Sequence, residues 1–314
     1  QVYLLAWTTT PWTLPGNVAL AVGSKIAYAI LRIKNNESPR QNKFGAGQAG
    51  IKEVYILAKD RINDVFDNFE LVGEMRGEDL VGLEYEPLFE VEKLKSKNSY
   101  KIYAADFVNT DEGTGVVHTA VMYGEDDYKL GEEVGLPKHH TVDEEGRFTD
   151  EVNGFSGLRV KDKETEEKIL KYLEARDYLL KTEDYRHDYP HCWRCETPLL
   201  YYARESWFIA MAELKDRLIR ENKKINWIPE HIKNGRFGEW LKDLKDWAIS
   251  RNRYWGTAMP IWECGGCGEE LVLGSREEIA DHLGRSKNRF ILMRHGEAES
   301  NTKKINSVSR ESSE

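Results

Sequence analysis

The chain has 314 residues, of which 40% are hydrophobic and 32% charged, and its formal net charge at pH 7 is -9. This composition is typical of a soluble globular protein that is long enough for two domains. No stretch has the length and apolarity of a membrane span or the pattern of a signal peptide. The acidic balance argues against a surface that coats nucleic acid, because neutralising phosphates needs clustered Lys and Arg, but it does not exclude local basic patches.

The two ends of the chain indicate a piece of a longer protein. The sequence begins with Gln1 rather than Met and ends in a polar Ser and Glu tail. We therefore expect an internal segment. In the absence of a secretory pattern, four cysteines favour reduced thiolates in the cytoplasm over disulfides.

The first seventeen residues predict a ligand-binding surface. Residues 2–7 form an apolar run that is typical of a buried strand. The hydroxyl groups that follow can both donate and accept hydrogen bonds. Pro11 and Pro15 fix local backbone dihedrals, so these hydroxyls are presented in a preset geometry. The polar side chains of this string are Thr8, Thr9, Thr10, Thr13 and Asn17, and they are interleaved with Trp7 and Trp12.

Short apolar runs separated by turn residues predict a β-rich domain over residues 1–157, with a barrel as its architecture. The polar, Gly-rich stretch 34–50 is expected to be an exposed loop. The expected strands are residues 3–7, 18–22, 27–33, 54–58, 101–104 and 115–118.

A second motif runs from Gly113 to Tyr128. Gly113 and Gly115 flank Thr114 and are expected to allow a ligand to approach the backbone closely. His118 and Asp127 stand where their side chains can face a pocket. We therefore predict a small-ligand site that combines this motif with the threonine string.

The pattern changes after residue 157. Ile169, Leu170 and Leu173 are spaced as one face of a helix that Asp162 is placed to cap. Further helices are expected over residues 212–221 and 230–245, followed by a strand over 247–249. This mixture is typical of part of an α/β domain, which we place at residues 158–275.

Two Cys-x-x-Cys pairs, Cys192 with Cys195 and Cys264 with Cys267, each have the spacing of a zinc knuckle. Four thiolates around Zn²⁺ leave no open position, so the predicted site is structural. The alternative is a redox role like that of thioredoxin for one pair, which is disfavoured because there are two pairs.

The string Trp7 to Asn17 resembles the threonine-rich peptide of the editing domain of isoleucyl-tRNA synthetase, and Gly113 to Tyr128 resembles its second signature. Valyl and leucyl relatives carry a Thr-Arg-Pro version of the first string. One departure is that Ala120 is followed by Val121-Met122-Tyr123 where relatives have Ala-Pro. Residues 189–198, 205–208 and 250–257 resemble the segments by which the synthetase chain re-enters its nucleotide-binding catalytic domain.

This resemblance implies roles for the motif residues. Asp127 is expected to hold the ammonium of a mischarged aminoacyl group, and His118 to line the side-chain pocket. With Asp127, the predicted catalytic residues are Thr8, Thr9, Thr10 and Asn17, which position a ribose and a water. The predicted substrate-binding residues are Trp12, Thr13, Thr114, His118 and Asp127. Arg251 and Arg253 are candidates for contact with ATP or the tRNA acceptor end.

The resemblance also implies the overall organisation. We expect a mixed α+β chain in which a β-barrel-like editing domain precedes part of an α/β, Rossmann-type catalytic domain with a zinc-binding insertion. The parent enzyme would be a monomeric isoleucine-tRNA ligase that uses ATP with Mg²⁺. Its partners would be tRNA(Ile), isoleucine, valine and their adenylates. The chain contains neither the His-Ile-Gly-His nor the Lys-Met-Ser-Lys-Ser signature, so it is not expected to aminoacylate tRNA alone.

Residues 276–314 carry a foreign pattern. An apolar run followed by Arg294-His295-Gly296 resembles the first motif of the histidine phosphatase superfamily, in which the histidine is phosphorylated and arginine supplies positive charge. The chain stops before the remaining catalytic groups of that fold. Two alternatives therefore stay open, namely an editing module fused to a phosphatase and a non-catalytic, zinc-containing module that binds tRNA.

Overall fold

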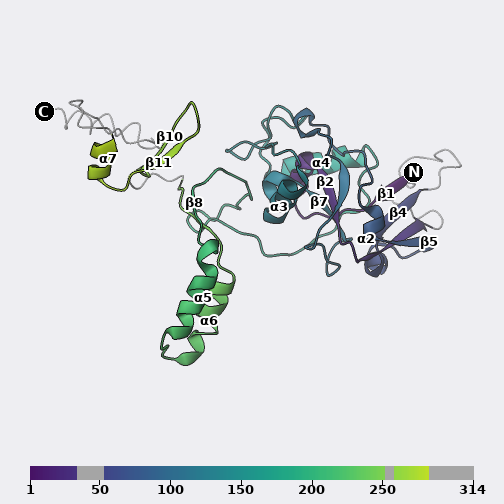
Figure 1. The fold of residues 1–314 in the computed structure, drawn as a ribbon. Coiled ribbons are helices and arrows are strands. Elements are labelled where there is room, and N and C mark those ends of the chain that lie inside the picture. The colour runs from purple at the N-terminus through teal and green to yellow at the C-terminus, as the bar shows by residue number, and fades with distance from the viewer. Residues whose placement is uncertain (34–52, 252–257, 283–314) are drawn as a thin grey trace. The chain divides into compact units, whose positions relative to one another are not determined.

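The computed structural model of the chain describes residues 1–33, 53–251 and 258–282. These residues belong to two compact units, residues 1–204 and residues from 205 onward (Figure 1). The predicted loop 34–50 and the tail residues Arg294 and His295 lie outside the described residues. Among the described helices, none combines the length and apolarity needed to cross a bilayer.

The first unit contains two sheets. The four-stranded sheet has the order β1-β4-β3-β5, from β1 (Val2–Leu4), β4 (Val54–Ala58), β3 (Ala27–Ile33) and β5 (Phe69–Arg76). β1 runs parallel to β4, and the other pairs are antiparallel. The three-stranded sheet has the order β6-β2-β7, from β6 (Lys101–Ala104), β2 (Ala19–Val22) and β7 (Val116–Thr119). β2 is parallel to β6 and antiparallel to β7.

One hydrophobic core joins the two sheets. It takes Tyr28 and Ile56 from the larger sheet and Leu20, Ile102 and Val116 from the smaller one. Burial of this shared apolar surface is the main force that holds the sheets together. The mixed α/β character is therefore confirmed. In the described residues both sheets stay open at their edge strands, so closure into a barrel is not confirmed.

Five of the six predicted strands match observed strands closely, and the first is shifted to Val2–Leu4. The sequence pattern missed β5. This strand lies at a sheet edge, and most of its residues are exposed or half-exposed. An edge strand with Glu70, Glu74 and Arg76 lacks the apolar alternation that identifies a half-buried strand.

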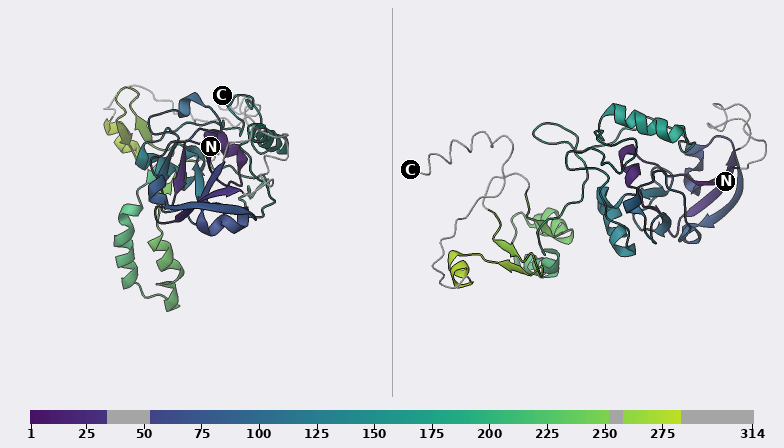
Figure 2. Two further views of the ribbon diagram at one scale, coloured as in Figure 1. Left: turned by 90° about the vertical axis from the view of Figure 1, so that its right-hand side faces the viewer. Right: turned by 90° about the horizontal axis from the view of Figure 1, so that it is seen from above.

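The described residues of the first unit form four α-helices, α1 (Ile62–Val65), α2 (Gly77–Leu80), α3 (Glu125–Val134) and α4 (Lys163–Glu174). Figure 1 labels α2, α3 and α4, and Figure 2 gives two further views of the ribbon. The predicted helix after Asp162 is confirmed as α4. Asp162 occupies the N-cap position, but its backbone carbonyl rather than its side chain accepts the bonds from Thr165 and Glu166.

Helix α4 packs against the first unit. Ile169 and Leu173 are buried in a core with Trp12, Phe148 and Phe155. The compact unit therefore extends to Arg204, beyond the domain boundary predicted near residue 157. The physical reason is that the apolar face of α4, although it follows a change of sequence pattern, is buried by residues from the β-rich part.

The second unit is small and has much exposed apolar surface. α5 (Lys215–Lys224) and α6 (Arg236–Lys242) lie side by side as a hairpin (Figure 1). Two short antiparallel pairs are present, β8 (Phe208–Ile209) with β9 (Trp247–Ala248) and β10 (Ile261–Glu263) with β11 (Glu270–Val272), and α7 (Arg276–His282) follows. The helices and the strand predicted over 212–249 are confirmed with shifted ends.

The loop before β7 lies against the end of β4. Ala58 N donates to Thr114 O at 2.8 Å. Gly115 has a φ of +71°, and a Cβ added there would lie 2.5 Å from Ala58 Cβ. Gly115 is thus required by its packing against Ala58. The predicted close approach of a ligand to Gly113 and Gly115 stays a prediction, and both residues line the pocket described below.

We predict that Gly115→Ala lowers the free energy of unfolding by about 3 kcal/mol. The alanine would have to adopt a left-handed backbone conformation, and its Cβ would overlap with Ala58. The matched control is Gly154→Ala, because Gly154 has a φ of +82° and open space around it. It should cost only about 1 kcal/mol. Denaturant unfolding measures both, and equal losses would contradict the close contact with Ala58.

Candidate functional site

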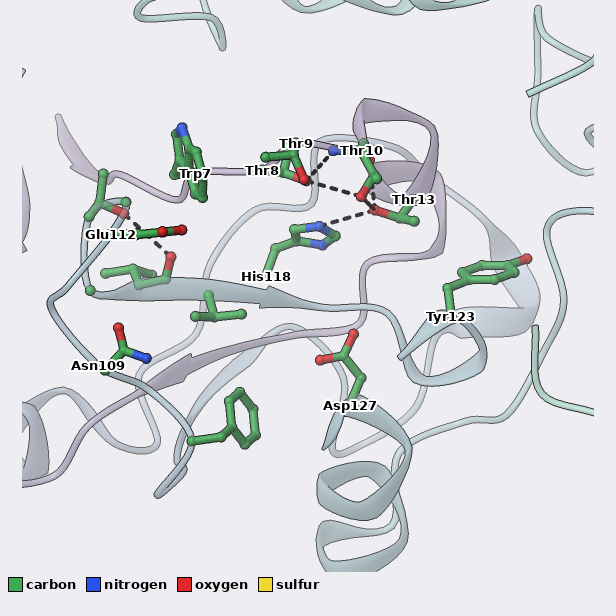
Figure 3. Close-up of a pocket in the computed structure, with 16 residues that line it drawn as sticks. Trp7, Thr8, Thr9, Thr10, Thr13, Asn109, Glu112, His118, Tyr123 and Asp127 are labelled. Carbon is green, nitrogen blue, oxygen red and sulfur yellow. Dashed lines mark hydrogen bonds between the residues drawn. The ribbon is translucent and has the colours of Figure 1, made fainter. Parts of the chain in front are cut away.

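A pocket of about 340 Å³ lies where three segments of the first unit meet (Figure 3). The segments are the chain after β1, the loop that leads into β7, and the start of α3. Its volume is within the range of small-molecule sites. The lining residues are Trp7, Thr8, Thr9, Thr10, Thr13, Phe107, Asn109, Glu112, Gly113, Thr114, Gly115, Val116, Val117, His118, Tyr123 and Asp127.

One wall of the pocket is a chain of hydroxyl groups. Thr10 N donates to Thr8 Oγ1 at 3.1 Å, and the Thr10 hydroxyl lies 3.4 Å from that of Thr8 and 3.3 Å from that of Thr13. The 3₁₀ helix η1 (Pro11–Gly16) turns the backbone so that Thr13 returns over Thr10. The fixed dihedrals of Pro11 and Pro15 favour this turn. Thr9 is exposed at the rim.

His118 joins β7 to this hydroxyl chain. Its Nε2 lies 3.1 Å from Thr13 Oγ1, and Thr13 Oγ1 itself donates to Thr10 O at 2.8 Å. Because the single hydroxyl hydrogen of Thr13 is used there, we assign Nε2–H as the donor to Thr13. Burial lowers the pKa of His118 to about 4, so the ring is neutral at pH 7. In the described residues its Nδ1 is buried with no partner.

Asp127 stands in the first turn of α3, which begins after Gly124. Ala120 N donates to Asp127 Oδ2 at 3.1 Å. Burial raises the pKa of Asp127 to about 6, and the Ala120 hydrogen bond opposes that rise. A Cβ at Gly124 would lie 2.9 Å from Asp127 Oδ2, so the glycine makes room for the carboxylate. The result is a partly desolvated acid without a cation beside it among the described residues, ready to bind one.

Three consecutive carbonyl groups of the loop before β7 are held from outside the pocket. Gly113 O accepts from Arg61 Nε at 2.9 Å, and Gly115 O accepts from the Tyr28 hydroxyl at 2.6 Å. Thr114 O accepts from Ala58 N, as described above. None of these three donors lines the pocket. The loop is therefore fixed by the body of the protein before any ligand binds.

The pocket gathers most of the predicted site residues. Thr8, Thr9, Thr10, Thr13, Thr114, His118 and Asp127 all line it. The sequence analysis did not single out Tyr123, Glu112 and Asn109. Tyr123 shapes the back of the pocket, since its hydroxyl accepts from Thr141 N at 2.7 Å and from Val142 N at 2.9 Å. The one sequence signal that could have identified Tyr123 as a pocket residue is its position within the motif Gly113 to Tyr128.

Two predicted residues lie outside the pocket. Asn17 is buried, where its Nδ2 donates to Ala19 O at 2.8 Å and its Oδ1 accepts from the Tyr85 hydroxyl at 2.6 Å. Trp12 is 5% exposed and packs edge-on against Tyr123. Both therefore support the pocket from behind, because their side chains are already committed to internal contacts.

The two cysteine pairs have the same local geometry. Cys192 N donates to Thr197 O and Cys192 O accepts from Glu196 N, at 2.9 and 2.8 Å. Cys264 N donates to Glu269 O and Cys264 O accepts from Gly268 N, both at 2.8 Å. Glu196 and Gly268 each have a positive φ, of 57° and 71°. Backbone N–H groups of Gly266 and Cys267 lower the pKa of the Cys264 thiol.

The pairs belong to different compact units, the first before residue 204 and the second after it. In the described part of the chain, no group of three or more His, Cys, Asp or Glu side chains is gathered for a metal. A closed four-thiolate site is thus not confirmed. Of the two candidate arginines, Arg251 donates to Ala248 O and Ser250 O, and Arg253 lies outside the described residues.

The sequence matches the family described as tRNA synthetases class I (I, L, M and V) over residues 33–310. It is 44% identical over 280 residues to the isoleucine-tRNA ligase of Clostridium tetani, covering 89% of this chain and 25% of that protein. The isoleucine-tRNA ligase of Clostridium novyi is 46% identical with the same coverage, and that of Treponema denticola is 43% identical over 303 residues. The chain spans about a quarter of the length of these relatives.

Similarity to solved structures is weak. The P. falciparum cytosolic leucyl-tRNA synthetase editing domain is 13% identical, with a TM-score of 0.37 over 64% of this chain and 80% of that one. The P. knowlesi cytosolic leucyl-tRNA synthetase editing domain is 18% identical, with a TM-score of 0.31 over 40% of this chain and 48% of that one.

The raised pKa of Asp127 has a consequence for stability. An acid whose pKa is higher in the folded than in the unfolded state destabilises the folded protein as the pH rises. For Asp127 this loss occurs between the unfolded pKa, near 4, and the folded pKa, about 6. We therefore predict that the free energy of unfolding of Asp127→Asn at pH 7 is about 1 to 2 kcal/mol higher than that of the wild type. This figure allows for the partial exposure of the side chain.

The gain should vanish below pH 4, where Asp127 is protonated in both states. Urea unfolding between pH 4 and pH 8 measures it. The matched control is Asp126→Asn, which removes the same charge from an exposed position in the same helical turn. A pH-independent difference between the two variants would contradict the desolvation of Asp127.

Proposed function

The chain belongs to the family of class I tRNA synthetases for isoleucine, leucine, methionine and valine, and on that premise we propose that it is the editing part of an isoleucine-tRNA ligase together with an adjoining piece of its catalytic domain. The proposed reaction is hydrolysis of the ester that joins a wrong amino acid, valine, to tRNA(Ile).

The observation that carries this proposal is that the pocket has two chemically different walls. One wall is the hydroxyl chain of Thr8, Thr10 and Thr13, and the other carries the Asp127 carboxylate. An aminoacyl ester has matching groups, since its ammonium suits a carboxylate and its ribose hydroxyls suit threonine side chains. Among the described residues no cation lies beside the buried Asp127 carboxylate, so the ammonium of such a ligand would stabilise its ionised form.

In the proposed reaction a water oxygen attacks the ester carbonyl carbon. The new carbon–oxygen bond forms while the carbonyl electron pair moves onto its oxygen. Collapse of this intermediate breaks the bond to the ribose oxygen, which takes up the proton that the water loses. Among the described residues that line the pocket there is no cysteine, serine or lysine, and the hydroxyls of Thr8, Thr10 and Thr13 are hydrogen-bonded to one another, so water is the proposed nucleophile.

Orientation supplies most of the proposed catalysis. The hydroxyl groups of Thr8 and Thr10 are held by backbone and side-chain hydrogen bonds, so a ribose and a water meet donors and acceptors that are already in place. Neutral His118 keeps Thr13 and Thr10 in register. Thr9, at the exposed rim, is proposed to contact the ribose from outside. Asn17 is proposed to act indirectly, by fixing the backbone at the end of η1.

Editing answers a limit of hydrophobic recognition. Valine and isoleucine differ by one methylene, and in the established case of these two amino acids one pocket separates them by only about 1 to 3 kcal/mol. A second, smaller pocket that admits valine but excludes isoleucine removes the error. Val117, His118 and Tyr123 are proposed to set that size limit, because all three line the pocket.

The whole parent protein is proposed to adenylate isoleucine with ATP and Mg²⁺ and to transfer it to tRNA(Ile), with valine and both adenylates as further ligands. We assign the editing role to residues 1–157 and the connective and catalytic roles to 158–275. The shared core of the two sheets also supports, without completing, the predicted barrel. No described residue bears on the histidine phosphatase pattern of the tail.

We also propose that the four cysteines bind one structural Zn²⁺. The support is that two loops far apart in sequence adopt the same turn, with the same pair of hydrogen bonds around their first cysteine. In the second loop the thiols of Cys264 and Cys267 are hydrogen-bonded to each other, so they are near enough to share a metal. When bound, the metal would tie together the two passages of the chain and leave no position for substrate.

The proposed function predicts that Asp127→Ala in the full-length enzyme lowers kcat/KM for hydrolysis of Val-tRNA(Ile) by about 10- to 100-fold, because a charge-assisted contact to the ammonium is lost. The rate of isoleucine attachment should not change. Deacylation and aminoacylation assays measure the two activities.

Asp126→Ala is the control for that variant and should behave as wild type in both assays. Unchanged hydrolysis of Val-tRNA(Ile) by Asp127→Ala would remove the basis of the assignment. So would equal loss in the two variants, because Asp126 is exposed and lies outside the pocket.

The zinc proposal predicts one zinc ion per full-length folded chain by elemental analysis. Cys192→Ser and Cys264→Ser, one variant in each pair, should both reduce that stoichiometry, because each removes one of four ligands. Thiol titration should find the cysteines protected until a chelator is added. Folded protein without zinc, or a loss in only one of the two variants, would count against a shared site.

A further inference from the structure

An aromatic side chain stands at every second position from Tyr185 to Trp193. In an extended chain alternate side chains share a face. Neighbouring rings are close, with centroid separations of 5.8 Å from Tyr185 to His187, 5.9 Å from His187 to Tyr189 and 6.0 Å from Tyr189 to His191. We call Tyr185, His187, Tyr189, His191 and Trp193 the ring row, in which the first four lie along the extended chain and Trp193 follows in the turn at residues 193–195.

The ring row is open to solvent. Tyr185 is 41% exposed and Trp193 is 82% exposed. His187 and His191 are exposed, and Tyr189 is half-buried. Leaving four exposed rings in water forgoes the apolar burial that aromatic side chains normally provide. A row of this kind therefore suggests a partner with flat surfaces of its own.

The row begins at the mouth of the pocket. Tyr185 packs edge-on against Trp7 with a centroid separation of 4.9 Å, and its hydroxyl is hydrogen-bonded to Glu112. Trp7 and Glu112 both line the pocket. The ring row is thus continuous with the pocket wall, and a polymer with its terminal unit in the pocket would meet the rings in succession.

Cations stand at the rings. Lys161 Nζ lies 4.0 Å from the centroid of the Tyr189 ring, and the Arg194 guanidinium lies 4.9 Å from that of Trp193. In the described residues neither cation has a carboxylate within 4.0 Å. Asp184 directly precedes the row and Asp188 lies between His187 and Tyr189, both at even positions, which an extended chain turns to the opposite face. The ring face therefore combines aromatic surfaces with positive charge, and Glu166 offsets the charge of Lys161 only in part.

We propose that the ring row binds the single-stranded 3′ end of the RNA whose terminal aminoacyl nucleoside occupies the pocket. Bases stack on aromatic rings whatever their sequence, and lysine or arginine beside them meets the backbone phosphates. This inference rests on the proposed function and extends it, since it names the surface that receives the nucleotides before the terminal one. His187 and Tyr189 are the central contacts.

The test compares two non-hydrolysable probes in the full-length protein. One is adenosine carrying valine through an amide at the terminal ribose, and the other is a single-stranded tetranucleotide ending in the same valyl-adenosine. Wild type should bind the tetranucleotide at least 10-fold more tightly than the nucleoside, and this advantage should shrink as salt is raised from 50 to 300 mM.

His187→Ala and Tyr189→Ala should each weaken binding of the tetranucleotide by about 10-fold while binding of valyl-adenosine stays unchanged. Tyr189→Phe retains the ring and should bind as wild type. Trp240→Ala, which removes an exposed ring in the other unit, should leave both affinities unchanged. Thermal unfolding of each variant confirms that it is folded.

The outcomes are distinguishable. If wild type binds neither probe, the proposed function fails and the ring row loses its premise. If wild type binds both probes equally, or if the alanine variants keep the full advantage of the tetranucleotide, the pocket function stands and the ring row is overturned. If Tyr189→Phe loses as much as Tyr189→Ala, the contact is made by the hydroxyl and stacking is rejected.

Discussion

The pocket depends on the way the Gly113-Thr114-Gly115 loop is held against the body of the protein. Each of its three carbonyl groups accepts a hydrogen bond from a different place, namely Arg61, Ala58 and Tyr28. Gly115 comes so close to Ala58 that no side chain fits between them. Because the loop leads directly into β7, this anchoring also fixes the strand that carries His118.

The hydrogen bond between Thr13 and His118 then joins two segments that are 105 residues apart in sequence. The imidazole that donates it is neutral at pH 7, because burial lowers the pKa of His118 to about 4. Burial acts in the opposite sense on Asp127, whose ionised form it disfavours. Desolvation thus keeps the hydrogen-bond network of His118 neutral on one side of the pocket. On the other side it destabilises the Asp127 carboxylate, which a bound cation would stabilise.

This contrast supports the proposed hydrolysis without a protein nucleophile. Fixed hydroxyl groups lose little entropy when they meet a ribose and a water. A bound ammonium stabilises the ionised carboxylate, so binding offsets the desolvation cost of burying Asp127. Function and stability are therefore opposed at Asp127, as they often are where a charged group is buried for binding.

Local sequence was sufficient for much of the fold, because strands such as Ala27–Ile33 and helix α4 bury apolar side chains in a regular period. It failed for β5, whose exposed edge position removes that period. It also placed the domain boundary before α4, since a change of pattern does not reveal which core a helix face will join.

For the site, the sequence by itself determined which functional groups are available: hydroxyls, an imidazole, a carboxylic acid and two thiol pairs. Only the tertiary structure decided which of them meet. It brought Thr8, Thr10, Thr13, His118 and Asp127 to one pocket, turned Asn17 and Trp12 into the interior, and continued the pocket wall into the ring row. The physical reason is that side-chain type follows from sequence, whereas burial, pKa and neighbours follow from contacts between distant segments.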